Sequence, residues 1–217
     1  EKPTGSLGIG AGYNSSDGTV ATFNVNERNF LGKGQTVKLD LSTSKIEKQT
    51  AIGFEDPSFL GRNLFAGISF GQTTLTPSSV SLNTDKLYFA PKVGFPLSRD
   101  SKISIKYSFD KENVKTSAQL GLLSPVIRND LGKKNKSALT FNYNLDKTNS
   151  VITPTSGYEF DITQELNGLG GDISYSKTEL NFKTYRTIIR DDIILSSNLS
   201  SGVIVGSDAS LMNRFNL

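Results

Sequence analysis

Carboxylates are the side chains in this sequence best suited to acid–base chemistry, and two adjacent pairs occur, Glu55-Asp56 and Asp191-Asp192. A general acid–base site needs groups that converge on one substrate. Both pairs lie near the ends of alternating stretches, and neighbouring side chains of a strand point to opposite faces. We therefore interpret these carboxylates as solvated turn residues and predict no catalytic residue among them.

Other chemistries are limited by composition. The chain has no histidine, cysteine or tryptophan, which removes histidine bases, cysteine nucleophiles, disulfides and the usual zinc sites. No motif organises the remaining Ser, Lys and Tyr side chains into a nucleophilic site. We expect no enzyme activity, no cofactor and no bound metal. The net charge of +3 is scattered, without a basic run interleaved with aromatics, which argues against a nucleic-acid partner.

The glycine-rich stretch GSLGIGAGYNSSDG, residues 5–18, suggests a phosphate-binding loop at first sight. Such a loop needs a strand before it and a helix N-terminus after it. Here a tight-turn signal, NSSDG, follows the glycines, and another alternating stretch comes next. The spacing therefore predicts a strand, a turn and a second strand.

Alternation of apolar and polar residues recurs along almost the whole chain, and no convincing helix pattern is present. No run approaches the roughly 20 apolar residues of a membrane-spanning helix. Many of the alternating stretches reach about 10 residues, the length of membrane-spanning strands, whereas strands of soluble sandwiches usually have about 5–6. We predict eleven strands, near residues 5–14, 19–29, 35–45, 48–58, 63–73, 84–97, 101–113, 135–146, 157–167, 172–187 and 192–206.

A transmembrane barrel exposes one face of each strand to lipid and the other to water, so its mean hydropathy is near neutral. In the stretch KISIKYSF, for example, Ile105 is expected to face lipid and Lys106 the lumen. The residues predicted to face lipid are Leu39, Leu41, Ile103, Ile105, Tyr107, Phe109, Leu139, Phe141, Tyr143, Phe160 and Ile162.

The connections between the strands alternate in kind. One set is short and pairs an aromatic residue with a basic one, which is typical of a belt at the membrane interface. The other set is mostly longer and more polar, including residues 73–84 and 113–135. Short turns on one side and long loops on the other are typical of outer-membrane barrels. The predicted belt residues are Phe30, Phe59, Phe95 and Tyr185.

These features predict an all-β, antiparallel, up-and-down transmembrane β-barrel. Single-chain bacterial barrels have an even number of strands, so eleven strands indicate part of a larger barrel of about sixteen. Residues 1–217 are expected to form one partial barrel domain. Pro91 conflicts with a regular strand because proline cannot donate to the ladder, and we expect a bulge there.

Several motifs resemble the barrel of BamA-type outer-membrane assembly proteins, the bacterial surface antigen family. They are GAGYNSSDG at residues 10–18, NERNFLGKGQ at 26–35, GFEDPSFLGRN at 53–63 and PTSGYEFDITQELNGLGGDISYSK at 154–177. The chain departs from the family pattern after Asp146, where Lys147 and Thr148 replace an expected x-Arg. The family's Arg-Gly-Phe loop would follow the last residues of this sequence, and its preceding POTRA modules are absent from it.

The resemblance implies a protein of the bacterial outer membrane that folds and inserts other barrel proteins. It implies unfolded outer-membrane proteins and outer-membrane lipid as partners, and accessory lipoproteins bound through POTRA modules. A related exporter of a single partner, a porin-like channel and a soluble β-sandwich remain as alternatives.

In the resembled family the first strand borders a weak seam and pairs with incoming strands. This implies a gate strand here, composed of Ser6, Leu7, Gly8, Ile9, Gly10, Ala11, Gly12 and Tyr13. Its glycines have two interpretations. Each weakens a strand by roughly 0.5–1 kcal/mol relative to alanine, which would loosen the seam. Alternatively, they make room for a loop or a sharp bend inside the barrel.

Overall fold

The computed structural model describes residues 4–76, 82–118, 123, 125, 128, 131–189 and 193–206. Within these residues the chain forms one sheet of eleven antiparallel strands, in which each strand pairs with the next along the sequence. The eleven predicted strands are confirmed, with shifts of a few residues at their ends. The strands are β1 (Gly5–Asn14), β2 (Gly18–Phe30), β3 (Gln35–Thr43), β4 (Glu47–Asp56), β5 (Phe65–Leu75), β6 (Leu82–Pro96), β7 (Ser101–Thr116), β8 (Gly132–Asp146), β9 (Gly157–Asn167), β10 (Tyr175–Ile189) and β11 (Ile193–Val205).

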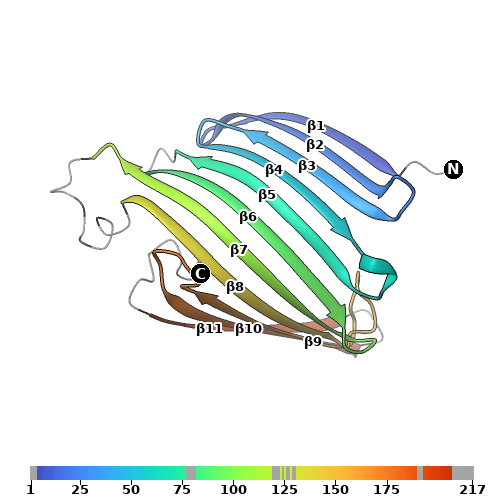
Figure 1. Cartoon of the computed structure of the whole chain (residues 1–217). Helices are drawn as coiled ribbons and strands as arrows, with labels where there is room; N and C mark the ends of the chain where they lie inside the picture. Colours follow the sequence, from blue (N-terminus) through green and yellow to red (C-terminus); the bar gives the residue numbers. More distant parts are fainter. Residues whose placement is uncertain are drawn as a thin grey trace.

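The sheet curls into a deep trough, as Figure 1 shows, with β1 along one rim and β9, β10 and β11 across the opposite side. It is a single layer, so the described residues do not form a sandwich of two packed sheets. In the described part of the chain, β1 and β11 are the two edges, and each pairs on one side only. This arrangement is an open portion of an up-and-down barrel wall.

Cross-strand register divides the side chains into two faces. Ile105 of β7 lies opposite Val93 of β6 and Phe141 of β8, whereas Lys106 lies opposite Lys92 and Thr140. Because side chains alternate along each strand, the first set continues across the sheet as an apolar face and the second as a polar face. All eleven residues predicted to face lipid lie on the apolar face.

The polar face is the concave one. Side chains on the inside of a curved sheet converge and shield one another, and the most buried strand residues are nearly all on the polar face, among them Asp110 at 6% exposure and Ala138 at 0%. Large residues of the apolar face stay open, for example Phe70 at 49%. The apolar side chains therefore form the convex surface, as in a barrel that faces lipid.

Two connections share a Leu-Gly pair in left-handed backbone conformation. Leu31 and Gly32 have φ of 54° and 71°, and Leu60 and Gly61 have φ of 58° and 68°. Leu60 belongs to η1, a single turn of 3₁₀ helix (Phe59–Gly61). A positive φ is rare for leucine. The recurring Phe-Leu-Gly-basic motif therefore specifies one turn conformation, used at the end of the sheet where β2 meets β3 and β4 meets β5, here called the turn end.

Loop lengths separate the two ends of the sheet less cleanly than expected. We call the opposite end, where β1 meets β2 and β7 meets β8, the loop end. Two of its connections are short: residues 15–17 join β1 to β2, and residues 44–46 join β3 to β4. At the turn end, the connection between β8 and β9 runs over residues 147–156. The contrast between short turns and long loops therefore does not hold for every hairpin.

Pro91 lies within β6 without the bulge expected from the sequence. It pairs with Ile68 of β5 in an unbroken register. On the other side the register with β7 is also constant, but the pairs that would contain Ala90 and Pro91 are missing from the ladder. The sheet thus accommodates the proline by losing pairing locally rather than by inserting a residue.

No helix among the described residues is long and apolar enough to span a membrane. In the same residues, no group of three or more acidic, histidine or cysteine side chains is arranged to hold a metal ion.

Candidate functional site: the first strand and the concave wall

The first strand has one paired and one unpaired side. β1 pairs with β2 without interruption from Gly5 opposite Glu27 to Asn14 opposite Gly18, and no other strand borders it in the described part of the chain. Leu7 and Ile9 are 66% and 77% exposed and lie on the apolar face. An unpaired row of backbone N–H and C=O groups is a template for another strand.

The glycines of β1 line its concave side, and packing does not explain all of them. An added Cβ at Gly12 would meet nothing within 4 Å, and at Gly8 it would come within 3.5 Å of Asn24 only. At Gly10 it would approach the hydroxyl of Thr22 at 2.6 Å, an atom that a rotamer change can move. None of the three has a positive φ. In the described residues, therefore, no loop or bend requires glycine at Gly8 or Gly12.

Charged side chains of opposite sign face one another across the concave wall. Lys86 of β6 pairs with Asp110 and Glu112 of β7 at 3.0 and 3.6 Å, and Lys38 of β3 pairs with Glu55 of β4 at 3.0 Å. Such cross-strand pairs join neighbouring strands side by side. They make the concave wall hydrophilic.

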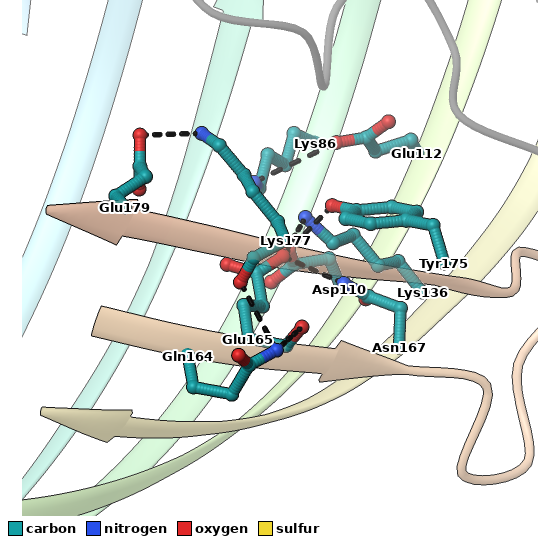
Figure 2. A network of polar contacts seen from close by, with 10 residues as sticks. All are labelled: Lys86, Asp110, Glu112, Lys136, Gln164, Glu165, Asn167, Tyr175, Lys177 and Glu179. Atoms are coloured by element: carbon teal, nitrogen blue, oxygen red, sulfur yellow. Dashed lines mark hydrogen bonds and ion pairs between the residues drawn. The ribbon is translucent and has the colours of Figure 1, made fainter. Parts of the chain in front are cut away.

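The most enclosed part of this wall centres on Glu165 of β9. Figure 2 shows the side chains of Lys136 of β8 and Tyr175 of β10 next to each other, with their polar ends directed toward this carboxylate. Lys136 lies 3.1 Å away, and the Tyr175 hydroxyl and the Asn167 amide donate hydrogen bonds of 2.7 and 2.6 Å. The Lys136 ammonium also lies 5.3 Å from the centre of the Tyr175 ring, within cation–π range. The cluster ties together three strands near the loop end.

Sequence reasoning did not single out this cluster. Its members are far apart in the chain, and only the pairing of β8, β9 and β10 brings them together. The sequence contained one sign of it. Lys136, Glu165 and Lys177 occupy the alternate positions of their strands that carry polar residues, so all three were predictable as residues of the polar face.

The four residues predicted to form an interfacial belt divide into two groups. Phe30, Phe59 and Phe95 are each 39% exposed and lie toward the turn end. Tyr185 instead lies opposite Gly157 and Ser196 on the polar, concave face. Proximity to a turn suggested the belt position, but the parity of β10 directs Tyr185 inward.

The adjacent carboxylates Glu55 and Asp56 point to opposite faces, as two different partners show. Glu55 binds Lys38, and Asp56 accepts a hydrogen bond of 2.9 Å from the side chain of Gln35. Asp191 and Asp192 lie outside the described residues.

Comparison with known families identifies the superfamily of this chain. The model of the Omp85 superfamily domain matches residues 29–217. The chain belongs to the Omp85 superfamily. This Omp85 chain is 23% identical to the outer membrane protein assembly factor BamA of Neorickettsia risticii, over 99% of the chain and 29% of that protein. It is 29% identical to the sorting and assembly machinery component 50 homolog of Mus musculus, over 87% of the chain and 40% of that protein.

A solved structure agrees with the Omp85 assignment. The crystal structure of BamA from Haemophilus ducreyi lacking POTRA domains 1–3 superposes with a TM-score of 0.78 at 17% identity, covering 97% of this chain and 43% of that one. The sheet of this Omp85 chain therefore has the fold of part of that barrel. The chain spans less than half the length of these relatives.

Proposed function

We propose that this chain is part of an outer-membrane barrel that folds and inserts other barrel proteins, with the edge of β1 as the template for incoming strands. The proposal is supported by the glycine-rich β1, whose Gly8 and Gly12 are not required by packing in the described residues, together with the names of the two relatives. Backbone hydrogen bonds along an open edge bind an extended segment with little dependence on its sequence. This suits a protein that must accept many different substrates.

The glycines support a mobile edge. Because neither Gly8 nor Gly12 is needed for packing among the described residues, their effect is to weaken β1. Two such residues lower its stability by about 1–2 kcal/mol relative to alanine. A weakened first strand separates more easily from whichever strand closes the barrel against it, and its edge then becomes available.

The names of the two sequence relatives favour assembly over export, since one is an assembly factor and the other a component of sorting and assembly machinery. The partners that follow are unfolded outer-membrane proteins and the lipid of a bacterial outer membrane, with accessory lipoproteins bound through POTRA modules. The lipid-facing role of the apolar face and the belt role of Phe30, Phe59 and Phe95 belong to the same proposal.

Photocrosslinking in the full-length protein tests the template role. A crosslinker at Leu7 or Ile9 is expected to trap folding substrates. The control position is Leu39, which lies on the same apolar face, in β3, a strand paired on both sides. Labelling of only the protein's own last strand from Leu7 and Ile9, or equal substrate labelling from Leu39, would contradict a template at β1.

A further inference from the structure

The apolar face changes character abruptly toward the loop end of β7. Ile103, Ile105, Tyr107 and Phe109 occupy successive outward positions, and the next outward positions are Lys111, Asn113 and Lys115. Lys111 and Lys115 are exposed. The boundary between the apolar band and cationic side chains therefore falls within one outward step, between Phe109 and Lys111.

A third lysine joins them from the neighbouring strand. Lys133 of β8 is the direct partner of Asn113 and is also exposed. Lys111 and Lys115 precede and follow Asn113 on the same face of β7, so both are diagonal neighbours of Lys133, at about 7–8 Å between backbones. Long lysine side chains can converge over that distance. We call Lys111, Lys115 and Lys133, with Asn113 at their centre, the outward lysine cluster.

Among the described residues, the carboxylates near the cluster neutralise only one of its three lysines, so the charges of the other two remain available to bind an anion. Asp85 of β6 binds Lys115 at 3.4 Å and also accepts a hydrogen bond from Thr74. Asp172 accepts hydrogen bonds from the backbone and side chain of Asn135. In the described part of the chain, neither Lys111 nor Lys133 has a carboxylate within ion-pair distance.

Exposed apolar side chains lie directly beside these charges. Leu87 of β6, opposite Lys111, is 38% exposed, and Phe89, opposite Phe109, is 40% exposed. A cationic group one step from open apolar surface matches an amphiphile that carries an anionic head on acyl chains. A soluble anion would use the charges but leave the apolar surface uncovered.

We propose that the outward lysine cluster binds the phosphate of an anionic phospholipid in the leaflet at the loop end. The Lys111 and Lys133 ammonium groups and the Asn113 amide supply donors to the phosphate oxygens, and Leu87 and Phe89 contact the acyl chains. This binding site is separate from the β1 edge and goes beyond the proposed function. It fixes the height of the β6–β8 wall in the membrane.

The test uses the full-length protein in membranes containing phosphatidylglycerol and phosphatidylcholine. Native mass spectrometry of the released protein counts the retained molecules of each lipid. We expect wild type to retain phosphatidylglycerol preferentially. The double variant Lys111→Gln/Lys133→Gln should lose this preference by about tenfold or more, since each of the two basic residues near an anionic membrane surface contributes roughly fivefold in binding. The matched control, Lys102→Gln/Lys106→Gln, makes the same charge change on the concave face of β7 and should retain the lipid.

Three outcomes would overturn the proposal. They are equal retention of the two lipids by wild type, an equal loss in the concave-face control, and full displacement of the retained lipid by inorganic phosphate alone, which would indicate a soluble-anion site. A further measurement needs no variant: raising the ionic strength should weaken retention of phosphatidylglycerol by wild type, and no salt effect would contradict the charged contact. Crosslinking from Leu7 and Ile9 is unaffected by any of these results.

Discussion

Tyr88 of β6 lies directly opposite Gly71 of β5 on the concave face and fills the space above it. A Cβ built on Gly71 would lie 2.6 Å from the Tyr88 ring, too close for any real contact. The glycine thus lets an aromatic ring lie flat against the neighbouring strand, an arrangement that pins the register of two strands.

Substitution of Gly71 tests this contact. Gly71→Ala should lower the free energy of unfolding by about 1–3 kcal/mol, because the Tyr88 ring must leave its position. Gly53→Ala is the matched control, since its Cβ would meet only Lys38 at 3.8 Å. Denaturant unfolding of the full-length protein in detergent measures both. Equal losses for the two substitutions would show that the contact between Tyr88 and Gly71 does not contribute to the free energy of unfolding.

The assignment of the two faces predicts unequal effects of neighbouring residues. Ile105→Lys should destabilise the inserted barrel by roughly 2–4 kcal/mol, the cost of a cation on the lipid face near the midplane. Lys106→Ala, on the concave face, should cost much less. Unfolding from lipid bilayers measures the difference, and similar losses would argue against the apolar face as the lipid surface.

The ion pair between Glu165 and Lys136 predicts that removing the negative charge of Glu165 lowers the stability of the protein, even when the hydrogen-bond acceptor is kept. Glu165→Gln keeps an oxygen that can accept from Tyr175 and Asn167, but it removes the negative charge beside Lys136, whose side chain is only 12% exposed. The pair is partly enclosed, with side-chain exposures of 12% for Lys136 and 23% for Glu165, so removal of the carboxylate charge should cost about 1–3 kcal/mol.

Glu159→Gln provides the comparison for Glu165. Glu159 binds Lys183 at 3.6 Å, with side-chain exposures of 30% and 38%. Such an exposed pair contributes about 0–1 kcal/mol. Thermal or denaturant unfolding of both variants should therefore separate them clearly. A loss at Glu159 as large as that at Glu165 would contradict the importance of enclosure.

The proposed role of the β1 glycines predicts opposite changes in stability and activity. Gly12→Ala has open space for its methyl group and should stabilise β1 by about 0.5–1 kcal/mol. If a weak first strand serves assembly, the same variant should slow the insertion of substrate barrels in a reconstituted assay. If Gly12→Ala raised stability but left insertion unchanged or made it faster, the glycines of β1 would have no role in the assembly mechanism.

Much of the architecture was determined by the sequence alone, because a period of two residues is intrinsic to a strand. The alternation around Ile105 and Lys106 predicted both the strand and its two faces, and the length of the strands predicted a membrane wall. The same rule, applied to Tyr185, would have placed this side chain on the concave face with Lys183. The belt prediction failed there because it used distance from a turn in place of parity.

Only the tertiary structure decided which side chains meet. Register and curvature depend on all neighbouring strands at once, so no single stretch of sequence predicts these contacts. Examples are Tyr88 over Gly71, Lys136 beside Glu165, and Lys133 between two lysines of β7. Pro91 is a further example: β6 keeps its register with β5 at this residue, although the pairs of Ala90 and Pro91 with β7 are missing. Local alternation decides which face a side chain occupies, whereas its neighbours on that face depend on long-range pairing.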